Sequence, residues 1–370
     1  MIKGYWAGVV ALVGFILMIG FVKFAKRKFN IPSARKAIHM GGGILAMSFP
    51  WLGEWNHILP AVVVACFILM ALRFTSKFKK DEEQSASGDF LYDTGDLNSY
   101  GEVIFPVVMA VLTWVTRLNP FLFVTPMAIL ALSDSSAALL GSKYGKENMA
   151  YKGEDKKTKF GSLVFFATCM IIVPMSALAF TDLAIKNILI ISLMVAITAT
   201  VFEMTASHGM DNLLVPLSTY LMLNSLVHLT YEEILMRFAY MAMIFMVASL
   251  AQTAKLVSTF SYLQFAIMLS VSLVSACRYA ATSVIIVSLA ITFVQKYIKK
   301  LNICIVKPSI VCSCYSVIVL VMFSARIIES VLAAVLFYAG NFLLISITLR
   351  NINKFLPSAK KKTKQEPVTA

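Results

Sequence analysis

The chain has 370 residues, of which 59% are hydrophobic and only 14% are charged. This composition excludes an ordinary soluble domain and indicates an integral membrane protein with several spans. The formal net charge of +14 would also suit nucleic-acid binding. However, the basic residues flank apolar segments, as topology-determining charges do, so we expect a lipid bilayer and no nucleic acid as partner.

Apolar segments of about 20 residues are expected to cross a membrane as helices. By this criterion the sequence predicts an all-α fold, a polytopic membrane bundle of about thirteen transmembrane helices. The expected spans are 5–24, 37–53, 57–73, 102–117, 120–141, 161–180, 187–206, 212–229, 233–253, 258–276, 279–297, 308–325 and 327–348.

The basic residues also predict the orientation of these spans. If the N-terminus is outside, the clusters at 23–36, 73–80, 143–159, 296–307 and 360–364 all face the cytoplasm, as the positive-inside rule requires.

The segments differ enough to predict a division of the chain. We expect a catalytic region at 1–230, where polar residues gather at the cytoplasmic ends of spans. An additional transmembrane bundle of unknown role is expected at 231–350, and a basic cytoplasmic tail at 351–370.

An acid, Asp134, stands inside the apolar segment that begins near Phe121. A carboxylate there is costly unless it faces protein, water or a metal, so it is a functional candidate by default. Small residues follow it, and then a lysine-rich loop that contains Lys143 and Lys157. An acid that holds a metal, next to lysines that hold phosphates, is the combination that phosphoryl transfer requires.

Two other cytoplasmic segments carry candidate site residues. Arg35 and His39 are four residues apart and share one helix face, with Lys36 beside them. His39 is alternatively a packed interfacial residue. Glu102 begins the span at 102–117, where a helix N-terminus favours an acid whether or not the acid has a role in a site.

The segment from Val201 to Pro216 is the third. Glu203 falls in the last turn of an expected helix, where the helix dipole favours cations, so a bound cation would resolve the conflict. Asp211 and Asn212 begin the next helix, and Asp211 is alternatively a simple helix cap.

These segments contain five motifs in a fixed order: RKAIH (35–39), GEVIFP (101–106), SDSSAALLGSKYG (133–145), KTKFGS (157–162) and E-x7-DN-x3-P (203–216). In this order they resemble the polyprenol kinase family, which includes dolichol kinase, phytol kinase and a CTP-dependent diacylglycerol kinase. The resemblance covers about residues 31–225. Phe160 departs from the family, whose members often have an acid at that position.

The resemblance implies a multi-pass membrane enzyme that transfers the γ-phosphoryl group of CTP to a lipid alcohol. The alcohol would be an isoprenoid such as phytol or dolichol, or diacylglycerol, and the active site would face the cytoplasm.

We expect Asp134, Glu203 and Asp211 to bind Mg²⁺ and, together with His39, to form the catalytic set. The expected nucleotide-binding residues are Arg35, Lys36, Lys143, Lys157, Thr158, Ser162 and Asn212. The proton acceptor for the alcohol is either His39 or one of the acids.

Two other functions are compatible with intramembrane charge. One is a cytidylyltransferase that makes a CDP-lipid, which differs from a kinase in its products. The other is a lipid transporter or flippase, which would distribute polar residues across the depth of the bilayer in both halves of the chain.

Overall fold

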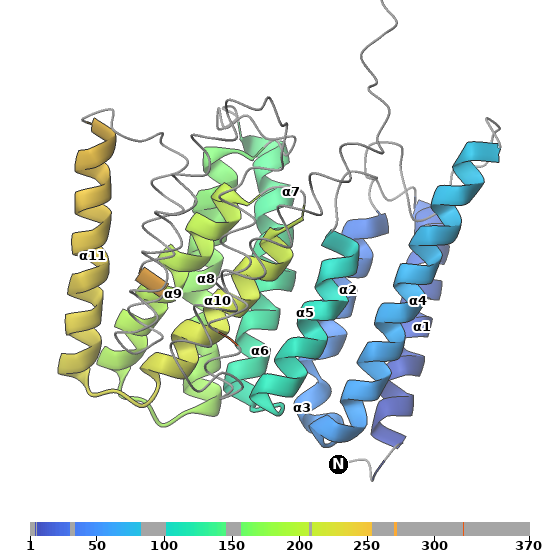
Figure 1. Cartoon of the computed structure of the whole chain (residues 1–370), viewed down its shortest axis with the longest axis horizontal. Coiled ribbons are helices and arrows are strands. Elements are labelled where there is room, and N and C mark those ends of the chain that lie inside the picture. The colour runs from blue at the N-terminus through green and yellow to red at the C-terminus, as the bar shows by residue number, and fades with distance from the viewer. Residues whose placement is uncertain are drawn as a thin grey trace, which may run out of the picture.

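The structure, a computed structural model, describes residues 4, 6–29, 34–82, 101–145, 157–206, 209–253, 270–271 and 321. The regular elements of these ranges are all helices, as predicted, and they lie side by side in a bundle (Figure 1). They are α1 (Trp6–Phe29), α2 (Ala34–Met47), α3 (Phe49–Leu52), α4 (Trp55–Glu82), α5 (Gly101–Thr116), α6 (Pro120–Ala128), η2 (Ile129–Ser133), α7 (Asp134–Tyr144), α8 (Lys159–Phe180), α9 (Ile185–Thr205), α10 (Asp211–Leu226) and α11 (Tyr231–Thr253).

Each expected span from 5–24 to 233–253 contains a helix, but two of them are not simple α-helices. The expected span 37–53 is divided at Ser48 into α2 and α3. Pro50, which has no N–H to donate, lies two residues later in the first turn of α3. The expected span 120–141 is a continuous helix whose middle, η2, is a π-helical turn.

Three helices within the described residues are long and apolar enough to cross a membrane: Pro120–Tyr144, Lys159–Phe180 and Ile185–Thr205. Shorter apolar helices occur at Trp6–Phe21, Trp55–Ala71 and Val103–Thr116. A helical membrane protein is therefore supported, and the total of about thirteen spans stays a prediction. The expected spans from 258–276 onward and the basic tail lie outside the described residues, apart from residues 270, 271 and 321.

Successive long helices run in opposite directions (Figure 1). In consequence α7 and α9 end on the same face of the bundle from which α2, α5, α8 and α10 begin. We call this face the ionic end, because it carries the cluster described below. The ends of α3, α5 and α8 and the starts of α1, α4, α9 and α11 lie at the other face. The expected order of spans predicts the same alternation, and the side of the membrane on which the ionic end lies stays a prediction.

Several helix starts have clear local causes. Asn119 caps α6, because its Oδ1 accepts a hydrogen bond from the Leu122 N–H at 3.1 Å, and Pro120 occupies the first helical position. A reciprocal pair of bonds between Thr230 and Glu233 forms a capping box at the start of α11.

The helix α9 lies near the centre of the bundle and α8 at its periphery. In the most apolar stretch of 18 residues of each helix, the buried share is 72% in α9 and only 22% in α8. The outer face of α8 exposes Leu163, Ile171, Met175 and Leu178. A face of this kind suits contact with lipid, whereas α9 is surrounded by protein.

Two glycine positions allow close helix packing. A Cβ atom on Gly43 of α2 would collide with the side chain of Ala131 in η2. A Cβ on Gly161 of α8 would lie 3.0 Å from the Ala137 carbonyl oxygen of α7. Small residues at such crossings let helix backbones approach, which is how membrane helices gain packing energy.

We predict that Gly43→Ala lowers the free energy of unfolding by about 1–3 kcal/mol, because the added methyl group overpacks the contact between α2 and η2. The measurement is the unfolding of the purified protein in detergent. The matched control is Gly20→Ala in α1, where a Cβ meets nothing within 4 Å. This control should be neutral or stabilising by up to about 1 kcal/mol, because alanine is the better helix former. Equal effects of the two changes would contradict the packing.

Candidate functional site

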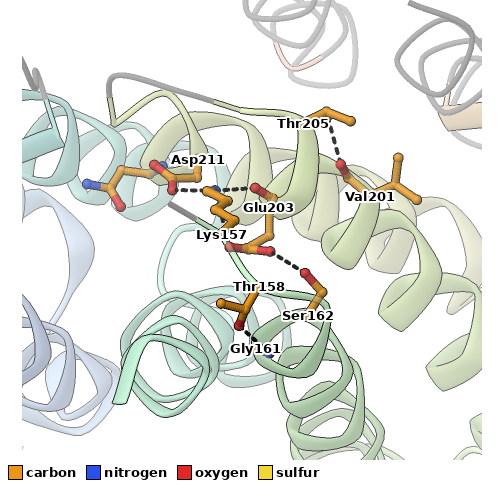
Figure 2. Close-up of polar contacts among 9 residues, drawn as sticks. Lys157, Thr158, Gly161, Ser162, Val201, Glu203, Thr205 and Asp211 are labelled. Carbon is orange, nitrogen blue, oxygen red and sulfur yellow. Dashed lines mark hydrogen bonds and ion pairs between the residues drawn. The ribbon is translucent and has the colours of Figure 1, made fainter. Parts of the chain in front are cut away.

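Ionisable side chains from three segments meet at the ionic end of the bundle (Figure 2). Lys157 lies two residues before α8, Glu203 lies in the last turn of α9, and Asp211 is the first residue of α10. Along the chain, Lys157 is 46 positions from Glu203 and 54 positions from Asp211. We call Lys157, Glu203 and Asp211 the ionic cluster.

Lys157 bridges the two acids. Its Nζ lies 3.1 Å from Glu203 Oε1 and 3.2 Å from Asp211 Oδ2, and it also donates to the backbone carbonyl oxygen of Glu203. The side chains are largely shielded, with exposures of 16% for Lys157, 9% for Glu203 and 19% for Asp211. Ion pairs with so little exposure are screened much less by salt than surface pairs are.

The surroundings of Lys157 keep it protonated. Burial by itself would lower the pKa of Lys157. However, attraction from Glu203, Asp211 and Asp134 outweighs burial and raises that pKa above its ordinary value of 10.5. A raised pKa means that this residue's contribution to stability is fully present below that ordinary value and is lost only at higher pH. The Lys157 side chain of the cluster is therefore positively charged at neutral pH.

The position of Glu203 explains why it needs a cation. The carbonyl groups at the end of α9 carry partial negative charge, which disfavours a carboxylate there. The Lys157 ammonium contacts both the Glu203 carboxylate and the Glu203 carbonyl. The cation that the structure shows at this helix end is Lys157 of the same chain, and the bound metal ion predicted there stays a prediction.

The two residues after the α9–α10 turn also have defined partners. Asp211 Oδ1 accepts the Asn212 N–H at 3.1 Å, while its other oxygen contacts Lys157. The side-chain amide of Asn212 donates to the Gly101 carbonyl oxygen at 2.9 Å. Asn212 thereby joins the start of α10 to the start of α5. Asp211 is not the cap of α10, because Met210 is the N-cap residue and no side chain caps this helix; Asp211 is instead a partner in an ion pair.

Thr158 and Ser162, both predicted to bind phosphate, hold the cluster from the side of α8. Thr158 caps this helix, because its Oγ1 accepts the Gly161 N–H at 3.0 Å. Ser162 is buried and donates from Oγ to Glu203 Oε2 at 3.4 Å (Figure 2). Each oxygen of the Glu203 carboxylate therefore has its own partner.

Asp134 and His39 interact with the cluster electrostatically. Asp134 acts on Lys157, and His39 acts on Asp211. The His39 ring also packs against Phe105 of α5, with a centroid distance of 4.3 Å. The structure therefore brings Lys157, Glu203 and Asp211 into direct contact, and Asp134 of α7 and His39 of α2 act on them through charge.

The other predicted residues are not placed in the cluster. Lys143 is exposed at the end of α7, with its Nζ 5.1 Å from the centroid of the Tyr144 ring. The side chains of Arg35, Lys36 and Glu102 lie outside the described part of the chain. Their roles stay predictions.

The predicted three-acid metal site also stays a prediction. Glu203 and Asp211 share the ammonium of Lys157. Across the described ranges, no group of three or more His, Cys, Asp or Glu residues is arranged to hold a metal ion. Carboxylate and hydroxyl oxygens are nevertheless the ligands that Mg²⁺ takes, and Glu203, Asp211 and Ser162 supply them at one place.

Sequence reasoning missed one feature beside the cluster. The π-helical turn η2 ends at Ser133, directly before Asp134, and the Cys169 Sγ of α8 lies 3.6 Å from the Ser133 Oγ. Such turns occur often at functional sites in membrane and soluble helices. The apolar run with Pro126 gave no periodicity that distinguishes a π-helical turn from an α-helix.

Comparison of the chain with protein-family models, with curated proteins and with solved structures finds no match.

We predict an order of stability among variants of the cluster. Lys157→Met should lower the free energy of unfolding by about 3–5 kcal/mol, because it leaves two shielded carboxylates without their cation. In that background Glu203→Gln should restore part of the loss, although the same change alone is destabilising. The double-mutant cycle should give a coupling energy of about 1–3 kcal/mol.

The measurement is unfolding of the full chain in detergent. The control is Asp182→Asn, an exposed acid in the connection between α8 and α9, which should leave stability unchanged. If Glu203→Gln destabilises the Lys157→Met variant as much as it destabilises the wild type, the two residues are not energetically coupled.

Proposed function

We propose that this protein is an integral membrane lipid kinase that transfers the γ-phosphoryl group of a nucleotide to a lipid alcohol. The donor that we propose is CTP, and the acceptor is an isoprenoid alcohol or diacylglycerol. The proposal includes a polytopic bundle of about thirteen spans with the ionic end at the cytoplasmic face.

The observation that carries the proposal is the ionic cluster itself. Lys157 belongs to the KTKFGS segment, and Glu203 and Asp211 belong to the E-x7-DN segment, which are far apart in sequence but in direct contact. Asp134 and His39, from two further segments, act on the same cluster. Two of the five motifs thus supply side chains that are in direct contact, and two others supply charges that act on them, at one end of a bundle of apolar helices.

The charge of this region favours a cation as the first ligand. Among Asp134, Lys157, Glu203 and Asp211 there are three carboxylates and one ammonium, so negative charge is in excess. A triphosphate is repelled by that excess unless a cation neutralises it. Glu203, Asp211 and Ser162 would hold Mg²⁺, which would supply this neutralisation of the phosphate charge.

In this proposal Lys157 changes partners, from the carboxylates of Glu203 and Asp211 to the nucleotide. It occupies the space between Glu203 and Asp211, so it must release at least one carboxylate before a divalent cation can share that pair. The released ammonium then lies beside the nucleotide, where it holds a phosphate oxygen.

The chemical step balances without any redox partner. The oxygen of the lipid alcohol attacks the γ-phosphorus, a new O–P bond forms, and the bond from that phosphorus to the bridging oxygen of CDP breaks. His39 or a neighbouring carboxylate accepts the proton of the alcohol. The lipid tail remains among the helices, with its hydroxyl at the ionic end.

The test uses the purified full chain in detergent with lipid, Mg²⁺, and either CTP labelled at the γ-phosphorus or CTP labelled at the α-phosphorus. Phytol, farnesol, dolichol and diacylglycerol are the acceptors for a kinase. Phosphatidate is added as the acceptor for a cytidylyltransferase, which needs a lipid phosphate to make a CDP-lipid. A kinase places only the γ-label in a lipid alcohol, and a cytidylyltransferase places only the α-label in phosphatidate. The absence of either label from every lipid would overturn the enzyme proposal.

We predict that Asp134→Asn lowers phosphoryl transfer by at least about a hundredfold, because it removes charge that positions the cluster and its cation. The measurement is the initial rate of γ-label transfer, with the unfolding temperature as a check on folding. The Asp182→Asn variant, at the opposite end of the bundle, is the control and should keep wild-type activity. A normal rate in Asp134→Asn would remove Asp134 from the mechanism.

We also predict that Lys157→Gln raises the affinity for Mn²⁺ in the absence of nucleotide by at least about tenfold, because both carboxylates lose their internal cation. Electron paramagnetic resonance of free Mn²⁺ measures this binding without any turnover. Adding Glu203→Gln to the variant should abolish the gain. Unchanged Mn²⁺ binding in Lys157→Gln would show that the cluster is not a cation site.

A further inference from the structure

The four tryptophans of the chain, at positions 6, 51, 55 and 114, gather at the end of the bundle opposite the ionic cluster. Trp6 and Trp55 are the first residues of α1 and α4, Trp51 belongs to the short helix α3, and Trp114 lies in the last turn of α5. Figure 1 shows all of these helix ends on one face. We call this face the tryptophan end.

Three of these side chains are open to the surroundings. Trp6 is 55% exposed, Trp51 is 53% exposed and Trp114 is 43% exposed. The indole has an apolar body and one N–H donor, so it is most stable where one part of the ring meets hydrocarbon and the other part meets polar groups. In membrane proteins that place is the headgroup layer.

Cations lie at the same end and contact aromatic rings there. The Arg117 guanidinium is 6.0 Å from the centroid of the Trp55 ring, and the Lys186 ammonium is 4.6 Å from that of Tyr231. Arg117 and Leu118 have positive φ values of 50° and 58°. The left-handed region is unfavourable for residues other than glycine, so the turn that carries Arg117 is held there by the surrounding structure.

Acids are interspersed with these cations. Four acids are exposed there: Glu54 directly before α4, Asp182 in the connection between α8 and α9, and Glu232 and Glu233 in the first turn of α11. A surface with both signs of charge matches a headgroup that carries both a phosphate and an ammonium. It does not match a purely anionic lipid surface, which attracts clusters of Lys and Arg alone.

The helix α8 extends from the ionic end to the tryptophan end, and its length is close to the thickness of a bilayer's hydrocarbon core. This helix has 22 residues, which corresponds to about 33 Å, close to the roughly 30 Å of a bilayer's hydrocarbon core. Its last residue, Phe180, packs against Trp51 with a centroid distance of 5.7 Å. Its cap, Thr158, is adjacent to Lys157 of the ionic cluster.

We infer that the tryptophan end is an interaction surface for zwitterionic phospholipid headgroups, and that the ionic cluster lies at the headgroup boundary of the opposite leaflet. The indoles lie at the level of the glycerol groups, Arg117 and Lys186 contact lipid phosphates, and the acids face the lipid ammonium groups. This inference does not depend on the kinase proposal.

The experiment uses the wild-type chain, whose native tryptophans are the reporters, reconstituted in phosphatidylcholine vesicles. One set of vesicles contains phosphatidylcholine brominated near the glycerol end of the acyl chain, and the other contains phosphatidylcholine brominated near the chain terminus. We predict that the shallow bromine quenches tryptophan fluorescence at least about twice as strongly as the deep bromine, because the indoles lie in the headgroup layer.

The matched variant is Ile171→Trp, in the middle of α8 on its exposed face. The added indole should increase quenching by the deep bromine and leave quenching by the shallow bromine nearly unchanged. Stronger deep than shallow quenching in the wild type would place the tryptophans in the hydrocarbon and overturn the inference. The absence of quenching from both depths would also overturn it, and would indicate a surface covered by protein or water.

Discussion

The contact on which the arrangement of α8, α9 and α10 depends at the ionic end is the Lys157 ammonium between the carboxylates of Glu203 and Asp211. Removing three charges from water is costly, and the attraction offsets that cost only when the geometry is good and the remaining oxygens are bonded. Here Ser162 bonds the second oxygen of Glu203, and the Asn212 N–H bonds the second oxygen of Asp211. The polar contacts thus fix three chain segments relative to one another.

Close backbone packing places Lys157 where it can make this contact. The residue directly precedes Thr158, whose hydroxyl caps α8 and lies 3.5 Å from the Gly141 carbonyl oxygen of α7. A Cβ atom on Gly141 would lie 2.8 Å from that hydroxyl, so a larger residue would push the cap away. The small residues of the SDSSAALLG segment therefore affect the ionic cluster indirectly. They let α7 approach the start of α8, and that approach orients the lysine.

Sequence reasoning predicted the helical class, the approximate helix bounds up to residue 253 and the convergence of distant motifs. Apolar length and the placement of basic residues are properties of local segments, so they can be read directly. Side-chain pairing is not local: Lys157 was expected to meet phosphate, and nothing in KTKFGS shows that its partners are Glu203 and Asp211. The misplacement of Glu203 at a helix C-terminus did signal a missing cation. The same signal does not distinguish a metal ion from a lysine, because both satisfy the electrostatic demand. The division at Ser48 and the π-helical turn before Asp134 were also missed, since both depend on packing against neighbouring helices.

The two ends of the bundle differ in the kind of polarity that they present, and this difference limits what the protein can bind. The tryptophan end mixes aromatic rings with charges of both signs, which suits a fluctuating headgroup layer. The ionic end holds two acids around one lysine in a shielded place, so these charges are paired within the chain itself. The three side chains of the ionic cluster carry two negative charges and one positive charge, so the cluster by itself repels an anion. Under the kinase proposal the nucleotide therefore arrives with its cation, and the pairing of Lys157 with its two acids is the contact that has to change.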